Sequence, residues 1–252
     1  MLKKRIIPLL LWQDGRLVKT RKFSNPRVVG DLIKTCKVYS DQDADEIIIL
    51  NISEGGAGSA EFNRAIAQLS KEVMMPISVG GGIRSIKEAE EAFRAGADKI
   101  VINSAAYLFP GLFAEVSSRF GAQAIIASVD FQMTSGGVSL WSESGKTKSS
   151  LSLDSHLSKL KSQGFGELMI QDIAADGMKC GYNLGVLENV LKVTSVPVIV
   201  AGGAGDFSHL RDAFELGVDA VACGTLFNFG DNNPIRAKAY LRNYGVPLKR
   251  LV

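Results

Sequence analysis

The sequence is poor in the residues that build metal and redox centres. It has three cysteines, two histidines and two tryptophans among 252 residues. The cysteines, Cys36, Cys180 and Cys223, are an odd number without metal-ligand spacing, which is typical of structural thiols in a reducing compartment. We therefore expect no disulfide framework, no metal and no cofactor.

Long apolar runs and an excess of one charge are also missing. No apolar stretch reaches the roughly 20 residues that a bilayer-spanning helix needs. The run 6–12 after a basic start resembles the beginning of a signal peptide, but it ends at Gln13 without a small-residue cleavage site. A net charge of +3, with 29 basic against 26 acidic residues, is too balanced for a nucleic-acid binder. We expect a cytoplasmic protein whose partners are small molecules or proteins, with no nucleic acid and no membrane.

What the sequence does contain is an internal repeat. The segment 79–84 (VGGGIR) recurs 121 residues later as 200–205 (VAGGAG). The same offset relates further pairs, namely Glu46 and Glu167, Gly96 and Gly217, and Asp98 and Asp219. A repeat of about half the chain length indicates duplication, with halves of about residues 1–122 and 123–252.

Eight apolar runs alternate with helical patterns, which indicates consecutive βαβ units. The expected strands cover residues 5–12, 46–52, 75–79, 99–103, 124–130, 167–172, 196–201 and 220–224. Parallel strands with right-handed crossovers leave no free edge only if they close on themselves. We therefore expect a single-domain α/β fold over residues 1–252, a (β/α)8 TIM barrel of two half-barrels, with functional groups at the C-terminal strand ends.

The two glycine loops are candidate phosphate sites. Glycine lets a phosphate approach backbone N–H groups, and the helix that follows offers its positive end to the same anion. Each loop has polar companions after the next strand, Asn103 and Ser104 in the first half and Thr225 in the second. Alternatively, the glycines only turn the chain tightly from strand to helix.

Polar residues at the C-terminal strand ends are candidates for chemistry. Asp130 is the strongest candidate for a general acid or base, and its alternative role is to cap the following loop. The other polar residues at these ends are Lys19, Asn51, Asp172 and Asp176. Residues 13–27 have the composition of a long polar loop with basic residues around Phe23, either a lid over an anion or a solvated loop. Residues 131–150 predict a hairpin over the same face.

A second charged set lies at the opposite ends of the strands. Four residues each begin a strand: Arg5, Glu46, Lys99 and Glu167. Two acids and two bases at one depth predict a salt-bridged ring at the floor of the barrel. Such a ring either stabilises the barrel or gates passage along its axis.

Taken together, these segments resemble the cyclase subunit of imidazole glycerol phosphate synthase, the HisF family of histidine biosynthesis. The resemblance covers nearly the whole chain and rests on the motifs KRIIP at 4–8, DGRLVK at 14–19, VGGGIR at 79–84, GADKIVINSAA at 96–106, DGMKCGY at 176–182 and GGAG at 202–205. It implies a barrel that accepts ammonia from a glutaminase docked on its floor and passes it to a bisphosphate substrate at the top.

The resemblance also implies roles for individual residues. The ammonia gate would be Arg5, Glu46, Lys99 and Glu167; the phosphates would be held by Gly82, Asn103 and Ser104 and by Gly203, Gly224 and Thr225, with Asp176 and Gly177 in the same set; Lys19 would join Asp130 in catalysis; and Asp98 would lie near the glutaminase contact.

The catalytic face departs from the family pattern, whereas the floor does not. The family's cyclase uses two aspartates as acid and base, and the first of these positions is Leu11 here. Losing one such group typically costs about 10²–10⁴-fold in rate. This split resembles the homologues found in bacterial surface-polysaccharide gene clusters, and that resemblance implies a glutaminase and barrel pair that supplies ammonia to a sugar amidotransferase in lipopolysaccharide biosynthesis. We favour this interpretation. The alternatives are a true histidine-pathway cyclase and a non-catalytic scaffold that activates the glutaminase.

Overall fold

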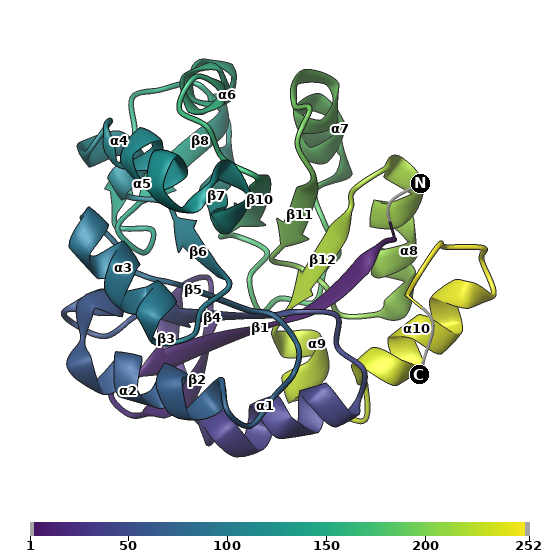
Figure 1. Ribbon diagram of the computed structural model, residues 1–252. Coiled ribbons are helices and arrows are strands. Elements are labelled where there is room, and N and C mark those ends of the chain that lie inside the picture. Colours follow the sequence, from purple (N-terminus) through teal and green to yellow (C-terminus); the bar gives the residue numbers. More distant parts are fainter. Residues whose placement is uncertain (1–2, 250–252) are drawn as a thin grey trace.

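The barrel closes as the alternation of strands and helices predicts. In the computed structural model, which describes residues 3–249, eight parallel strands follow the order β1, β4, β5, β6, β7, β10, β11, β12 and return to β1 (Figure 1). These strands are β1 (Arg5–Gln13), β4 (Ile47–Asn51), β5 (Ile77–Gly80), β6 (Lys99–Ile102), β7 (Ile125–Thr134), β10 (Glu167–Asp172), β11 (Val198–Ala201) and β12 (Ala220–Cys223). The predicted (β/α)8 barrel is confirmed, and the strand boundaries differ from the expected ones by a few residues.

Helices surround the strands and cover their outer face (Figure 1). The long helices are α1 (Leu32–Asp41), α2 (Ala60–Leu69), α3 (Ile86–Arg94), α5 (Leu112–Phe120), α6 (Leu153–Lys161), α7 (Leu184–Val193), α8 (Phe207–Leu216) and α10 (Pro234–Arg242). Single turns add α4 (Ala105–Leu108), α9 (Thr225–Asn228) and the 3-10 turns η1 (Gly56–Gly58) and η2 (Ala122–Ala124). No helix within residues 3–249 combines the length and the apolar character needed to cross a membrane.

Two antiparallel hairpins extend the sheet beyond the C-terminal ends of the barrel strands. Their strands are β2 (Arg16–Arg21), β3 (Ser24–Gly30), β8 (Gly137–Ser142) and β9 (Thr147–Lys148). The hairpin expected within residues 131–150 is confirmed. The expectation of an irregular loop over residues 13–27 is wrong, because Leu17 and Val18 are buried and pair with Trp12 and Leu11 of β1.

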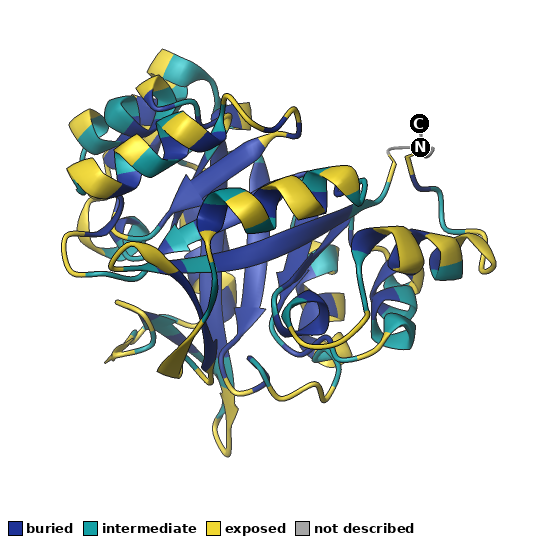
Figure 2. Ribbon diagram, turned by 90° about the horizontal axis from the view of Figure 1, so that it is seen from below, coloured by how far each residue is buried: buried dark blue, intermediate teal, exposed yellow. Residues whose placement is uncertain are grey.

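The core has two layers, one on each face of the barrel wall. Side chains that point outward pack against the helices, whose solvent-facing sides are exposed (Figure 2). Side chains that point inward form a separate apolar cluster along the axis: Ile7, Leu9, Ile48, Val101, Ile126, Met169, Ile199, Ala201, Ala220 and Ala222. The barrel is therefore filled by side chains, as expected for eight strands.

The two halves repeat individual contacts as well as elements. Oδ2 of Asp98 accepts a hydrogen bond from the Ile77 N–H at 2.8 Å, and Oδ2 of Asp219 accepts one from the Val198 N–H at 3.0 Å. Asp98 and Asp219 are 121 residues apart along the chain, and so are Ile77 and Val198. The repeat thus relates equivalent bonds, which supports our division into half-barrels.

A buried lysine joins the last helix to the barrel. Lys238 of α10 is fully buried, and its Nζ donates to the carbonyl and carboxylate oxygens of Asp43 at 2.6 and 2.8 Å. It also donates to Oδ1 of Asp45 at 2.8 Å, while Oδ2 of Asp45 accepts the Ile6 N–H of β1. The C-terminal helix is thereby tied to the start of the first strand.

Candidate functional site

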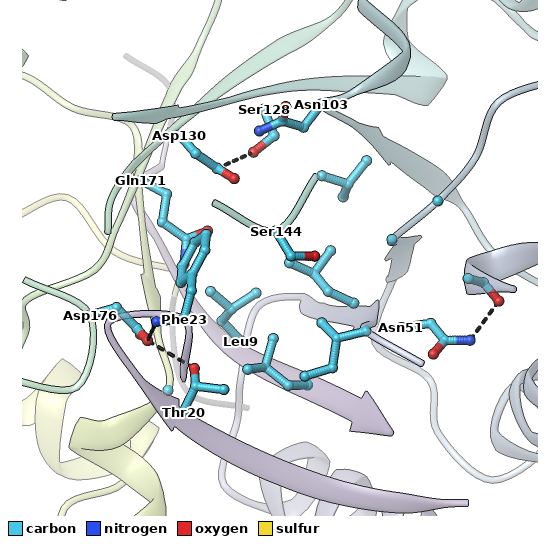
Figure 3. Close-up of a pocket in the computed structure, with 18 of the residues that line it drawn as sticks. Leu9, Thr20, Phe23, Asn51, Asn103, Ser128, Asp130, Ser144, Gln171 and Asp176 are labelled. Atoms are coloured by element: carbon cyan, nitrogen blue, oxygen red, sulfur yellow. Dashed lines mark hydrogen bonds between the residues drawn. The ribbon is translucent and has the colours of Figure 1, made fainter. Parts of the chain in front are cut away.

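A cavity of about 860 Å³ lies at the C-terminal ends of the barrel strands (Figure 3). Its wall includes both glycine loops, Asp130, Asp176 and Lys19, so residues far apart in the sequence meet there. The hairpin tips also line it, through Phe23 from β2–β3 and Ser144 from β8–β9. This is the face at which TIM barrels place their functional groups.

Asp130 is the buried acid of this cavity. It projects from β7, and its Oδ1 accepts a hydrogen bond of 3.4 Å from the hydroxyl of Ser128 on the same strand. Burial raises the pKa of Asp130 from 3.8 to about 7, the polar side chains of Asn103 and Ser128 oppose this rise, and the charge of Asp176 adds to it. A carboxyl with this pKa can both give and take a proton near neutral pH.

Asp176 holds the β2–β3 hairpin over the cavity. Its Oδ1 accepts a bond from Nζ of Lys19 at 2.7 Å, and its Oδ2 accepts one from the hydroxyl of Thr20 at 2.9 Å. The Lys22 N–H donates to its backbone carbonyl at 2.9 Å. Gly177 is required beside it, because a Cβ there would lie 2.8 Å from the Thr20 carbonyl oxygen. The basic residues around Phe23 are Lys19, Arg21, Lys22 and Arg27, and of these Lys19 alone lines the cavity.

The wall made by β1 and β4 is apolar. Leu11 lines the cavity together with Leu9, Leu50 and Ile52. Two polar residues also line this wall, Gln13 at the end of β1 and Asn51 at the end of β4. Asn51 is engaged by its own loop, since it donates to the Gly56 carbonyl at 2.6 Å and accepts from the Ser53 N–H at 2.9 Å. The acid of β7 therefore has no carboxylate facing it from β1.

Asp172 does not join the site. It ends β10 next to the cavity, but its Oδ1 accepts the N–H groups of Ala174 and Ala175 at 2.9 and 3.3 Å. Burial raises the pKa of Asp172, and these two backbone bonds oppose the rise. Among the sequence candidates at strand ends, this one has the loop-capping role.

Buried polar atoms without hydrogen-bond partners lie beside both glycine loops. Oγ1 of Thr225 and both polar atoms of the Asn103 side chain are buried and make no hydrogen bond with any described residue. Gly224 lies against Lys19, whose Cε is 3.1 Å from the position of a Cβ there. Buried polar groups in folded proteins are nearly always paired, so these atoms suit a bound polar ligand.

Ser104 is already engaged by the chain itself. Its hydroxyl oxygen accepts the Glu143 N–H from the β8–β9 turn at 2.8 Å. The β8–β9 hairpin is thereby attached to the first glycine site. Residues 143, 144 and 146 of this turn line the cavity.

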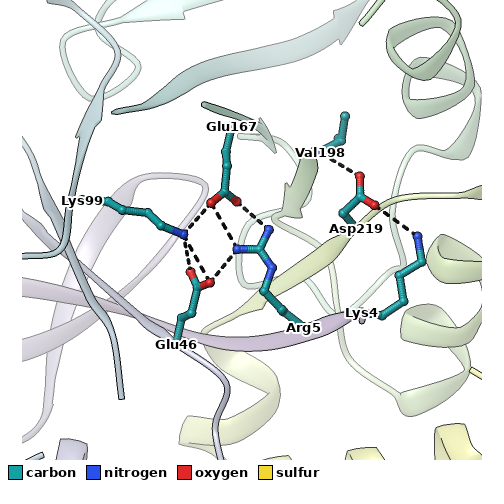
Figure 4. A network of polar contacts seen from close by, with 7 residues as sticks. All are labelled: Lys4, Arg5, Glu46, Lys99, Glu167, Val198 and Asp219. Atoms are coloured by element: carbon teal, nitrogen blue, oxygen red, sulfur yellow. Dashed lines mark hydrogen bonds and ion pairs between the residues drawn. The ribbon is translucent and has the colours of Figure 1, made fainter. Parts of the chain in front are cut away.

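At the opposite end of the barrel, the four predicted charges form a closed ring (Figure 4). Arg5 bonds Glu46 at 2.6 Å and Glu167 at 2.5 Å, and Lys99 bonds the same two carboxylates at 3.1 and 2.5 Å. Burial disfavours the charge of Glu167, but its bonds to Arg5 and Lys99 prevail and lower its pKa. Burial likewise opposes the charge of Arg5, whose bonds to both glutamates raise its pKa.

Between ring and cavity the inward-facing side chains are mostly apolar. Ser78 is fully buried on β5, and its hydroxyl has no partner among the described residues. Because Ile77 and Val79 belong to the outer layer, Ser78 faces the barrel axis. One more inward hydroxyl, that of Ser128, leads to Asp130.

Two cavity residues were missed in the sequence. Ser128 lies two residues before Asp130. Gln171 lies on the neighbouring strand β10, where it is the register partner of Asp130. The alternation of strand side chains could have identified Ser128, because residues i and i−2 share a face. Gln171 required the strand register, which the sequence alone does not fix.

No group of three or more His, Cys, Asp or Glu side chains within residues 3–249 has the arrangement of a metal site. Cys223 lines the cavity but is a poor nucleophile, because burial raises its pKa to about 12.

Comparison with known proteins gives consistent matches over the full length. A family model described as "Histidine biosynthesis protein" matches residues 5–233. The chain is similar to the imidazole glycerol phosphate synthase subunit HisF of Chloroherpeton thalassium, with 35% identity over 250 residues, which are 99% of this chain and 100% of that protein. The HisF subunit of Streptomyces coelicolor is 36% identical over 246 residues, 97% of this chain and 98% of that protein.

Proposed function

This chain belongs to the HisF family of histidine biosynthesis proteins, and from that premise we propose that it is the ammonia-receiving synthase subunit of a glutamine amidotransferase. In this proposal a glutaminase binds the N-terminal face, and ammonia enters between the ring residues. It then follows the barrel axis and reacts with a phosphorylated small molecule in the cavity.

The observation that carries the proposal is the alignment of ring, apolar interior and cavity on one axis. Apolar residues in place of the four ring side chains would cost the barrel little stability. Two buried glutamates and two half-buried bases at one end of a barrel whose other end holds a ligand-sized cavity therefore suit a transit role. The unpaired hydroxyl of Ser78 offers one polar contact on the way.

For the glutaminase, we propose a contact at the floor that includes Asp98. This carboxylate is exposed and is oriented by the Ile77 N–H. Its repeat equivalent, Asp219, is instead paired with Lys4 at 3.4 Å. Asp98 thus remains open to a cationic side chain of a partner.

In the cavity, we propose that Asp130 transfers protons and that Lys19 contacts the substrate. Asp130 is suited to this work by its burial and its pKa near neutrality. Lys19 is buried against Gly224 and paired with Asp176, so it would place a fixed positive charge at the second glycine site.

There are two candidate acceptors of the ammonia, and one observation favours each of them. The names of the similar proteins favour the cyclase reaction of imidazole glycerol phosphate synthase in histidine biosynthesis. The apolar β1 wall favours a different acceptor, because Leu11 gives Asp130 no second acid or base. We propose on this ground the amidation of a sugar in lipopolysaccharide biosynthesis, with a sugar amidotransferase as a further partner.

The transit role is tested by Lys99→Ala in the complex with the cognate glutaminase. The variant keeps Arg5 bonded to both glutamates but opens one side of the ring. We expect glutamine hydrolysis to continue while the fraction of its nitrogen that escapes as free ammonia rises several-fold. The measurement is the ratio of free ammonia to glutamate.

Lys4→Ala is the matched control, because Lys4 lies on the same face but pairs with Asp219 outside the ring. It should leave the ammonia-to-glutamate ratio unchanged. An unchanged ratio in Lys99→Ala as well would make the ring a purely structural feature and end the transit proposal.

The acceptor is tested by complementation of a histidine auxotroph that lacks its cyclase subunit. With Leu11 in place of an acid, we expect no growth without histidine, a loss of about 10²–10⁴-fold in rate being typical for one missing acid or base. Leu11→Asp alone should restore little, because the other departures of the strand ends from the family pattern remain. Growth of the unaltered protein at the normal rate would establish the histidine-pathway reaction instead.

A further inference from the structure

The internal duplication allows the two glycine loops to be compared position by position. In both halves a helix follows the loop, and the residue three positions after its N-cap bonds back to a loop N–H. In the first half this residue is Glu88, whose Oε2 accepts the Arg84 N–H at 2.7 Å. In the second half it is His209, whose Nδ1 accepts the Gly205 N–H at 3.2 Å. The four residues correspond at the offset of 121.

The two equivalents differ in charge and in access to the cavity. Glu88 lines the cavity, and its Oε2 also accepts the Ser85 N–H at 3.0 Å. A carboxylate of the chain itself thus occupies the N-terminal end of α3, where a phosphate would otherwise gain most. His209 carries no carboxylate. The carboxylate at the N-terminal end of α8 is that of the N-cap residue Asp206, which accepts the Ser208 N–H at 2.8 Å, and unlike Glu88 neither Asp206 nor His209 lines the cavity.

The surroundings strengthen this difference. At the first loop the cavity is lined by three carboxylates, Glu54, Glu88 and Glu143, against two cations, Arg84 and Lys146. A phosphate placed there would face like charges in a partly desolvated cavity, which weakens its binding. The first loop is therefore the poorer anion site of the two.

The polar atoms left free at each loop point to different ligands. At the second loop the free group is the Thr225 hydroxyl. The nearby Lys19 ammonium adds a positive charge and one further N–H, beyond those that it donates to Asp176 and to the Thr20 carbonyl. At the first loop the Ser104 hydroxyl is already bonded to the Glu143 N–H. The group without a hydrogen bond is the amide of Asn103, which lies close enough to Asp130 to lower the pKa of that carboxyl. An unpaired amide offers one acceptor and two donors, which matches hydroxyl or amino groups better than a phosphate.

We propose that the acceptor carries a single phosphate, held at Gly203 and Thr225, and presents hydroxyl or amino groups to Asn103 and Glu88 at the other end. The chemical class is a polyhydroxylated monophosphate such as a sugar phosphate. This inference rests on the proposed function for the existence of an acceptor, and it adds that the duplicated phosphate sites have diverged.

The test compares two probes with the same carbon skeleton, fructose 6-phosphate and fructose 1,6-bisphosphate, by titration calorimetry on the complete chain. We expect the monophosphate to bind at least as tightly as the bisphosphate. Glu88→Gln retains the acceptor for the Arg84 N–H but removes the charge, so it should tighten bisphosphate binding roughly tenfold and leave monophosphate binding nearly unchanged.

His209→Gln is the matched control in the other half. Disturbing the Gly205 loop should weaken both probes alike and leave their affinity ratio unchanged. A wild-type preference of tenfold or more for the bisphosphate overturns the proposal, as does a ratio that Glu88→Gln does not change.

If neither sugar binds, crystals soaked in inorganic phosphate decide the matter. One phosphate at Gly203 and Thr225 and none at Gly82 and Asn103 supports the divergence, and a second phosphate appearing only in Glu88→Gln strengthens it. A phosphate at Gly82 in the unaltered protein, or none at Gly203, overturns it. The proposed function is tested by the ammonia-to-glutamate ratio, which needs no phosphate probe. A failure of the single-phosphate proposal can therefore be told apart from a failure of the proposed function.

Discussion

At the scale of single residues, Asp130 carries a carboxyl group where its ionised form is poorly solvated. Burial raises its pKa from 3.8 to about 7, whereas the pKa of the unfolded chain stays near the ordinary value. A raised carboxyl pKa contributes stability that is fully present below about pH 4 and lost as the pH rises through about 7. At pH 8 the folded protein therefore contains an ionised acid whose poor solvation lowers the stability of the fold, as is common in functional sites.

We expect Asp130→Asn to be more stable than the unaltered protein at pH 8, by about 2 kcal/mol, because the amide has no charge to desolvate. The gain should disappear near pH 4, where the carboxyl is neutral. Denaturant unfolding at both pH values measures it. Asp176→Asn is the contrasting variant and should lose stability at pH 8, since its carboxylate is paired with Lys19 at 2.7 Å. Equal stability of Asp130→Asn and the unaltered protein at pH 8 would contradict the raised pKa.

For single residues, the sequence predicts well where the charged side chains lie and poorly which groups they bond. It placed Asp130, Lys19 and Asp176 at one end of the barrel because strand ends are readable from apolar runs. It gave Asp172 the same weight as Asp176, although one caps a turn and the other bonds a distant hairpin. Which of several strand-end carboxylates points inward depends on loop geometry, which no spacing rule supplies.

At the scale of secondary-structure elements, Lys238 fixes α10 to the barrel. Its ammonium satisfies both Asp43 and Asp45 in a fully buried position. Burial already raises the pKa of Asp45 in spite of this partner, so the carboxylates depend on the lysine. Breaking a buried pair on one side typically costs about 3–5 kcal/mol, because the remaining charge is uncompensated.

We therefore expect Lys238→Met to lower the free energy of unfolding by about 3 kcal/mol. Adding Asp45→Asn should recover part of the loss, since it removes the stranded charge while its amide oxygen can still accept the Ile6 N–H. The double-variant cycle in denaturant is the measurement. Purely additive losses would mean that the lysine contributes through packing alone.

The hairpins mark the limit of prediction for elements. Residues 131–150 were predicted as a hairpin because Gly136 and Gly137 mark its first turn. The β2–β3 hairpin was missed, because charged residues are spread along it and four consecutive residues, Leu17 to Thr20, are buried, so that no alternation marks a strand. Its pairing is fixed from outside, by β1 and by the carboxylate of Asp176. Tertiary contacts of this kind lie beyond local sequence patterns.

At the scale of the whole molecule, the duplication made the fold predictable. Eight apolar runs with one repeated motif left few arrangements other than a closed barrel, and closure then placed Arg5, Glu46, Lys99 and Glu167 in one ring. The same duplication hid the difference between the glycine loops, since equal spacing suggested equal ligands. The contrast between Glu88 and His209 becomes meaningful only when their loop bonds are known.

The apolar wall above the ring has a consequence for the proton balance of the proposed reaction. An ammonium ion passing Ile7, Ile48 and Ile126 would lose its hydration, whereas ammonia carries no charge to desolvate. Under the proposed function, nitrogen would therefore cross as the neutral molecule and leave its proton on the glutaminase side. Each turnover would make the N-terminal face more acidic by one proton relative to the cavity, and the barrel would divide the reaction into two compartments with separate acid–base supplies.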